Sequence, residues 1–325
     1  MQIDHIHFYV EDVSKQRDWF VQAMGCQVVS HTANRHTATE VLKHGAVYFV
    51  LSSPLSPHSP VADYLKKHPP GVADIALRVN GIEQLLAKAD QIQLPLQFSQ
   101  RNKGLRWAKI NGWGSLSHTL IENGSAVDFC QTFFNPEAQA HPNTNLGSET
   151  VTGFTSIDHV VLNVSAGALG QAVAWYQALL GFEVQQAFQI QTQTSGLNSK
   201  VLKSLEGEIY FNINEPSSAQ SQIQEFLDEN QGSGIQHIAL KTSNIVQAVT
   251  QMRERGMSFL SVPVTYYAQL KQRLKQVQRP PFLLQGMQAI EAQHILMDWK
   301  DSAPESILLQ IFSHPIFEQR TFFLS

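Results

Sequence analysis

The sequence predicts an α+β protein in which four βαβββ-like modules pair into two open-barrel domains. The first observation behind this is an internal repeat, because residues 3–10 read IDHIHFYV and residues 157–164 read IDHVVLNV. The second is another echo, between PPGVADIALRV (69–79) and GSGIQHIALKT (232–242). These segments are rich in β-branched and other apolar side chains, which is typical of strands. A chain that repeats the same elements in the same order is typical of a duplicated scaffold.

The elements between these strands repeat as well. In both halves a helical pattern follows the first strand and ends at a glycine, Gly25 or Gly181, which predicts a C-cap before the next strand. Further strands and one more helix then follow in each half. The strands are expected at 46–53, 117–122, 208–215 and 306–312, and the second helices at 81–91 and 244–255.

Two segments interrupt the repeat. The polar stretch that begins NPEAQAHPNTNLGSET has no hydrophobic periodicity, which predicts a linker over 135–152 between domains at 1–134 and 153–325. Residues 263–296 have no counterpart in the first half. Their first part is basic and helical in pattern, and we expect a solvated helix that covers one mouth of the cup formed by the second domain.

Composition narrows the class of protein. A hydrophobic content of 43% in 325 residues is enough for two domains with a sizeable core, and the net charge of −4 gives no reason to expect nucleic-acid binding. The two cysteines, Cys26 and Cys130, do not make a disulfide framework, which favours a reducing, cytoplasmic setting. The chain enters a strand pattern at once, so no signal peptide is expected, and no apolar run reaches the roughly 18 residues of a membrane span.

The repeat also singles out histidines. It aligns His5 with His159 and Asp74 with His237, so only the second half keeps histidine at both positions. Alternate residues of a curved sheet point into its cup, and the two histidines of the second half are therefore expected to meet there as metal ligands. A single histidine is more often structural, which is what we expect of His5. Two imidazoles and a carboxylate form the facial triad of non-haem Fe(II) oxygenases.

Short motifs in the second half, where the resemblance is most specific, extend this interpretation. They are IDHVVLNV, SGLNS (195–199), NEP (214–216), SQIQEFL (221–227), GIQHIAL (234–240), TYY (265–267) and LLQIF (308–312). Together they resemble the 4-hydroxyphenylpyruvate dioxygenase family, in particular its cyanobacterial-type members. That family has the vicinal oxygen chelate fold, also described as glyoxalase/bleomycin-resistance-like.

The resemblance implies a set of site residues. Fe(II) would be the cofactor, held by His159 and His237. Catalytic roles would fall to Gln236 and Gln310. Substrate contacts would come from Ser199, Asn214, Gln222, Phe312 and Phe323. The plainer alternative is surface amides for the glutamines and core packing for the phenylalanines, although an amide inside the apolar strand around Gln310 needs a partner.

One position departs from the family pattern. The third iron ligand should be a glutamate in a strand of the form Thr-hydrophobic-Phe-hydrophobic-Glu, whereas TFFLS (321–325) places Ser325 there. A truncated or frameshifted version of an intact enzyme, which also lacks the family's C-terminal helix, would explain this. So would a genuine site with two protein ligands, or a site in which the α-carboxylate of Ser325 approaches the metal. Glu318 is another carboxylate near this position. The sequence around it predicts a turn, which favours a solvated side chain over a metal ligand.

The resemblance finally implies a reaction. It is the oxidation of 4-hydroxyphenylpyruvate by O2 to homogentisate and CO2, a step of tyrosine metabolism that supplies quinone and tocopherol precursors. The partners would be a small aromatic 2-oxo acid and O2, with no membrane partner and with a homodimer as one option for assembly. Two alternatives stay open: a 4-hydroxymandelate synthase-type reaction, and a catalytically impaired protein that only binds an aromatic acid.

Overall fold

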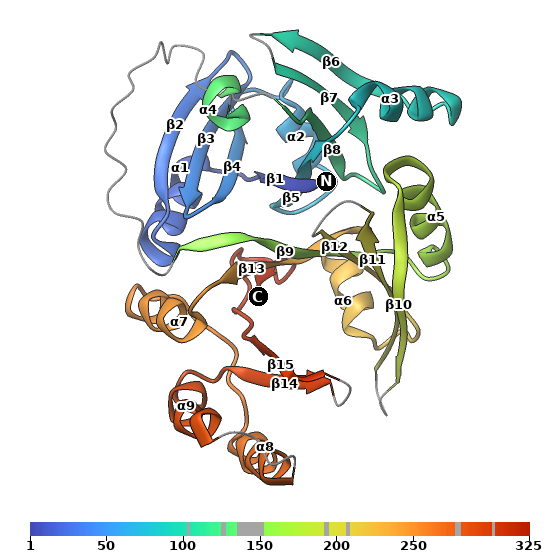
Figure 1. The fold of residues 1–325 in the computed structure, drawn as a ribbon. Coiled ribbons are helices and arrows are strands. Elements are labelled where there is room, and N and C mark those ends of the chain that lie inside the picture. Colours follow the sequence, from blue (N-terminus) through green and yellow to red (C-terminus); the bar gives the residue numbers. More distant parts are fainter. Residues whose placement is uncertain are drawn as a thin grey trace.

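The computed structural model describes residues 1–102, 105–124, 128–134, 153–191, 195–205, 209–276, 281–300 and 303–325. Within these ranges the chain forms two sheet-based halves that lie against each other (Figure 1). The expected linker, 135–152, lies outside the described residues.

The first half contains two βαβββ modules in one eight-stranded open sheet. The strand order is β2-β3-β4-β1-β5-β8-β7-β6. The first module consists of β1 (Gln2–Tyr9), α1 (Val13–Trp19), β2 (Gln27–Ala33), β3 (Thr37–His44) and β4 (Val47–Pro54). The second consists of β5 (Gly71–Val79), α3 (Ile82–Gln91), β6 (Leu96–Asn102), β7 (Leu105–Asn111) and β8 (Ser117–Glu122). Three short helices supplement them: η1 (Phe20–Met24), α2 (Pro60–Leu65) and α4 (Phe129–Phe133).

The second half repeats this order with additions. Its third module is β9 (Phe154–Asn163), α5 (Leu169–Leu180), β10 (Phe182–Gln191), β11 (Gly196–Ser204) and β12 (Tyr210–Pro216), followed by α6 (Gln222–Glu229). Its fourth is β13 (Gly234–Thr242), α7 (Ile245–Glu254), β14 (Leu296–Lys300), β15 (Ala303–Gln310) and β16 (Phe323–Leu324). Six strands form an open sheet in the order β10-β11-β12-β9-β13-β16, and β14 pairs with β15 as a separate hairpin. The α+β class and the open, paired modules are therefore confirmed.

Local chemistry explains where the first helices begin and end. The Asp12 side chain accepts from the backbone N–H groups of Ser14 and Lys15 at the start of α1. The chain leaves η1 at Gly25 and α5 at Gly181, with φ of 74° and 70°. These left-handed conformations favour glycine, so both predicted C-caps are present.

The unrepeated segment forms two helices rather than one. They are α8 (Val264–Gln276) and α9 (Pro281–Ala292), which lie beside β14 and β15 at the end of the second half remote from the first (Figure 1). Side chains of both helices enter the hydrophobic core: Tyr267, Leu270, Leu274, Met287 and Ile290. The segment is thus amphipathic: much of α8 is exposed, as expected of a solvated helix, while an apolar stripe packs into the core.

The two faces of the central strand β9 have different surroundings. In β9 the side chains of Val160 and Leu162 are fully buried in the main core, on one face of the sheet. His159, Val161 and Asn163 alternate with them and therefore share the other, concave face. Both cysteines are free and buried. In the part of the chain that the structure describes, no helix is long and apolar enough to cross a membrane.

Candidate active site

The two histidines singled out by the repeat lie side by side on the concave face of the second sheet. Strands β9 and β13 are antiparallel neighbours, in which His159 faces Ala239 and His237 faces Val161. The ring centroids of His159 and His237 are 5.7 Å apart, with an angle of 79° between the ring planes. The fold thus brings together two imidazoles that are distant in the sequence.

A β-bulge in β13 aims the second histidine. The register shifts between Ile235, which faces the core residue Leu162, and His237, which faces Val161 on the concave side. Gln236 is the extra residue at this shift and is half-buried. Bulges redirect side chains near active sites. Gln236 thus precedes His237 at the irregular point of the ladder, and no signal in the sequence predicts the bulge.

Asp158 orients the first histidine. Its Oδ2 lies 3.0 Å from Nδ1 of His159. Because a carboxylate only accepts hydrogen bonds, Nδ1 carries the proton and Nε2 keeps the lone pair that a metal needs. The hydrogen bond to His159 lowers the pKa of Asp158, which keeps the carboxylate ionised.

The second histidine is neutral in the folded protein. Burial, together with the neighbouring His159, lowers the pKa of His237 to about 3. Its Nδ1 is buried and has no hydrogen-bond partner among the described residues. A neutral imidazole with an unused ring nitrogen is ready to bind a metal or a ligand group.

Strand register brings Ser325 to the strand edge beside His237. Strand β16 runs parallel to β13, with Phe323 opposite His237, and the N–H of Ser325 donates to the carbonyl of Ile238 at 3.0 Å. By alternation the Ser325 side chain shares the face of His237, and its Oγ is buried without a partner in the described chain. The two imidazoles are ligands that suit Fe(II), so this part of the donor set fits the metal. The donor set departs from the facial triad at the third position, where a hydroxyl stands in place of a carboxylate.

Two phenylalanine rings pack against His237, the second member of the histidine pair. Phe323 stacks on His237 with a centroid separation of 4.6 Å and an interplanar angle of 19°. The ring of Phe312 lies 6.1 Å from each of them, edge-on to His237. Both phenylalanines expected at the substrate thus contact the expected metal ligand or each other. Gln310 precedes Phe312 by two residues, at the end of β15, and is half-buried.

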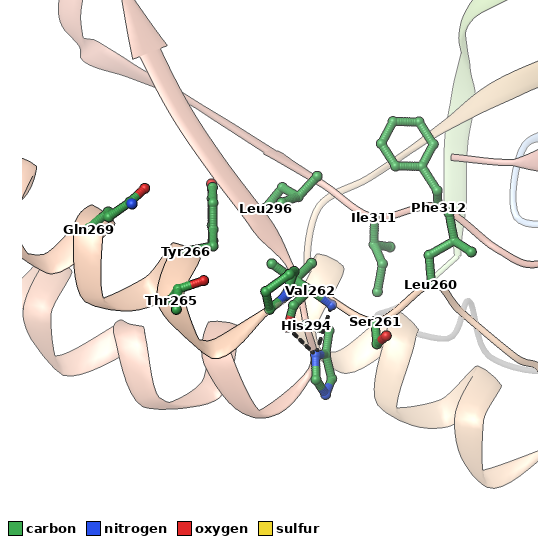
Figure 2. Close-up of a pocket in the computed structure, with 11 residues that line it drawn as sticks. Leu260, Ser261, Val262, Thr265, Tyr266, Gln269, His294, Leu296, Ile311 and Phe312 are labelled. Atoms are coloured by element: carbon green, nitrogen blue, oxygen red, sulfur yellow. Dashed lines mark hydrogen bonds between the residues drawn. The ribbon is translucent and has the colours of Figure 1, made fainter. Parts of the chain in front are cut away.

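A pocket of about 420 Å³ adjoins the site through Phe312 (Figure 2). Its lining is mainly apolar and comes from the unrepeated segment and the residues around it: Leu260, Val262, Pro263, Tyr266, Leu296 and Ile311. His294 accepts from the N–H of Val262 at 3.2 Å and so holds one wall (Figure 2). The volume is in the range of small-molecule pockets. Sequence reasoning did not anticipate this pocket.

The remaining predicted residues lie further along the same face. Ser199 on β11 faces Asn214 on β12, which in turn faces Asn163 on β9. Ser199 is buried, and Nδ2 of Asn214 donates to Oδ1 of Asn163 at 3.3 Å. Gln222 is the exposed first residue of α6, so the structure leaves it at the rim. Asn163 was not expected at the site, although an amide inside the apolar run VVLNV (160–164) was a visible signal.

Comparison with known proteins agrees with this architecture. Two family models described as Glyoxalase/Bleomycin resistance protein/Dioxygenase superfamily match residues 4–107 and 156–275. The 4-hydroxyphenylpyruvate dioxygenase of Caenorhabditis briggsae is 32% identical over 339 residues, which cover 99% of this chain and 84% of that protein. The enzyme of the same name from Dictyostelium discoideum is 31% identical, with 98% and 90% covered. An uncharacterized protein of a Synechocystis strain is 33% identical, with 99% and 90% covered.

A solved structure matches the whole fold. A mutant of 4-hydroxymandelate synthase from Streptomyces coelicolor superposes with a TM-score of 0.79 and 22% identity, over 99% of this chain and 90% of that one. The fold and the paired domain matches define a two-domain protein of the Glyoxalase/Bleomycin resistance protein/Dioxygenase superfamily. Within that class, the chain belongs to the 4-hydroxyphenylpyruvate dioxygenase family and is a dioxygenase.

Proposed function

We propose that this chain is a non-haem Fe(II) dioxygenase that converts 4-hydroxyphenylpyruvate and O2 to homogentisate and CO2. The observation that carries the proposal is the His159–His237 pair, 5.7 Å apart on a concave sheet face with Phe312 and Phe323 against it. Relatives named for this reaction support it over nearly the full chain. We expect the protein to act in the cytoplasm, and we leave a homodimer to be tested by its sedimentation.

The chain's own residues supply binding, orientation and a dry environment. His159 and His237 would hold the metal, which when bound would supply the redox chemistry with O2 and the attachment of the 2-oxo acid. Asp158 fixes the ring of His159 so that its free nitrogen faces the site. His237 is half-buried with the rings of Phe312 and Phe323 against it, and these would limit the access of water to the metal.

The aromatic and amide side chains would orient the substrate. The rings of Phe312 and Phe323 offer faces and edges for an aromatic ring to pack against. Gln236 adjoins the histidine pair and Gln310 precedes Phe312, so their amides would bind the polar groups of the acid. Ser199 and Asn214 would contact the substrate further along the cup, with Gln222 at its rim.

Oxygen uptake with Fe(II) and 4-hydroxyphenylpyruvate tests the proposal. The wild-type chain should consume one O2 and release one CO2 per homogentisate formed, and His237→Ala should abolish both. A parallel sample of the Ser325→Glu variant distinguishes two causes of low activity. The variant restores a missing carboxylate ligand but does not repair a defective substrate pocket. Formation of 4-hydroxymandelate would assign the alternative reaction. Binding of the acid without oxygen uptake, in both samples, would favour the pure binding protein and overturn the proposal.

A further inference from the structure

Two asparagine side chains on the concave face each have one buried polar atom that lacks a partner within the described chain. Asn163, the last residue of β9, is fully buried, and its Oδ1 accepts from Asn214 while its Nδ2 has no acceptor. Oδ1 of Asn212 on β12 is likewise buried and has no donor. Buried side-chain polar atoms nearly always find a partner. These two are therefore candidates to bind a group that the chain does not provide.

The strand register places both amides in the cup of the histidines. Strand β12 runs parallel to β9, with Asn212 opposite Val161 and Asn214 opposite Asn163. Val161 also faces His237 across the other edge of β9. Asn212 and Asn163 are thus diagonal neighbours on one face of the sheet, and Asn212 lies in the same cross-strand row as His237.

The free atoms define the chemistry of the missing group. Asn163 offers a donor and Asn212 an acceptor, so the group must accept one hydrogen bond and donate another. A hydroxyl does both, whereas a carbonyl or ether oxygen only accepts and an ammonium only donates. Rotation of the two amides by half a turn exchanges their roles, and a hydroxyl satisfies that arrangement equally well.

We propose that Asn163 and Asn212 determine substrate specificity by binding a hydroxyl group of the substrate between them. The inference rests on the proposed function, since it assigns these amides to the aromatic 2-oxo acid that the histidine pair would bind. The preferred substrate is then an aromatic 2-oxo acid whose ring carries a hydroxyl. When an acid without that hydroxyl binds, Nδ2 of Asn163 and Oδ1 of Asn212 stay unpaired. The free-energy cost of these unpaired atoms disfavours binding of that acid.

Anaerobic calorimetric titration of the Fe(II)-loaded protein tests this. The probes are 4-hydroxyphenylpyruvate, phenylpyruvate and 4-methoxyphenylpyruvate. The wild-type protein should bind the hydroxylated acid about 10- to 100-fold more tightly than either of the others. Asn212→Leu should reduce this ratio to about threefold or less, by weakening binding of the hydroxylated acid alone, and should leave iron content unchanged.

Matched variants keep the test decisive. Asn163→Leu should have the same effect. If the fully buried position of Asn163 does not tolerate leucine, the Asn212→Leu variant alone decides the test. Asn198→Ala is the control, because its amide donates to Oε1 of Glu215 at 3.0 Å on the opposite face. The control should keep the wild-type ratio. A wild-type ratio in Asn212→Leu, or equal binding of all three acids by an enzyme that still consumes oxygen, would overturn this inference alone. No binding of any acid would overturn the proposed function as well.

Discussion

The two cups of this protein share the order of their central strands, but the polar groups inside them differ. In the second, polar atoms of His237, Ser325, Asn163 and Asn212 are buried without partners among the described residues. In the first, Asp74 stands where His237 stands in the second, and it is fully satisfied. Lys109 Nζ lies 3.2 Å from its carboxylate, and both the N–H and the hydroxyl of Thr119 donate to it. The ammonium group of Lys109 thus balances the Asp74 carboxylate from within the first cup. The two halves therefore share a fold but not the set of polar groups inside the cup.

An aromatic plug completes this difference. His5, the counterpart of His159, stacks on Phe129 of α4 at 5.6 Å, and Phe134 packs against its edge. Asp4, His5 and Cys130 lie close enough to hold a metal ion. Asp4, however, already accepts from Nδ1 of His5 at 2.7 Å and from Arg78 at 2.6 Å. The first cup is filled and paired internally, which agrees with a structural role for His5.

The largest effect on stability is expected from the internal cation of the first cup. Burial alone would raise the pKa of Asp74, and the ammonium of Lys109 holds it below its usual value. Lys109→Met should lower the free energy of unfolding by about 3–5 kcal/mol, because it leaves a buried carboxylate uncompensated. Lys66→Met, which removes an exposed pair with Asp63, should cost at most about 0.5 kcal/mol. Urea unfolding measures both, and equal losses would show that Lys109 does not have this role.

A second prediction concerns the third ligand position of the second cup. Ser325→Glu would place a carboxylate where a hydroxyl now faces the histidines, and should tighten Fe(II) binding at least about tenfold. The same metal titration on Asp74→Glu, in the first cup, should show no gain. Unchanged affinity in Ser325→Glu would mean that position 325 does not face the metal.

A smaller effect on metal binding is expected from the carboxylates beside the two equivalent histidines. Asp158→Ala removes the acceptor that orients His159 and should weaken Fe(II) binding about tenfold. Asp4→Asn, at the matching position of the first half, should leave metal affinity as it is. If the two changes act alike, the metal site is not confined to the second cup.

The last prediction concerns the pH dependence of stability. Burial, followed by the charge of Lys109, lowers the pKa of His7 to about 3, well below its value of about 6.5 in an unfolded chain. Between these pH values the unfolded chain binds the extra proton, so this contribution is complete above pH 6.5 and is lost as the pH falls toward 3. His7→Gln should flatten the decline in unfolding free energy between pH 6 and 4.5 by about 1.4 kcal/mol per pH unit. An unaltered slope would contradict a neutral, half-buried His7.

The sequence predicted the frame of this molecule because the frame is what the duplication repeats. Alternation and glycine caps located the modules, and the echo of IDHIHFYV and IDHVVLNV placed His159 beside the strand of His237. The departures arise from non-local contacts. Lys109 reaches Asp74 from a strand that carries no motif, and α4 enters the first cup from the end of that half. The bulge at Gln236 and the unpaired amide of Asn212 depend on strand register, which periodicity alone does not give.

The central claim is that a duplicated scaffold has one working site. It is tested by measuring iron content and 4-hydroxyphenylpyruvate-dependent oxygen uptake side by side in His5→Ala and His159→Ala. His5→Ala should keep about one Fe(II) per chain and most of the wild-type oxygen uptake. His159→Ala should lose both. Equal loss in the two variants, or retention of iron by His159→Ala, would contradict the account.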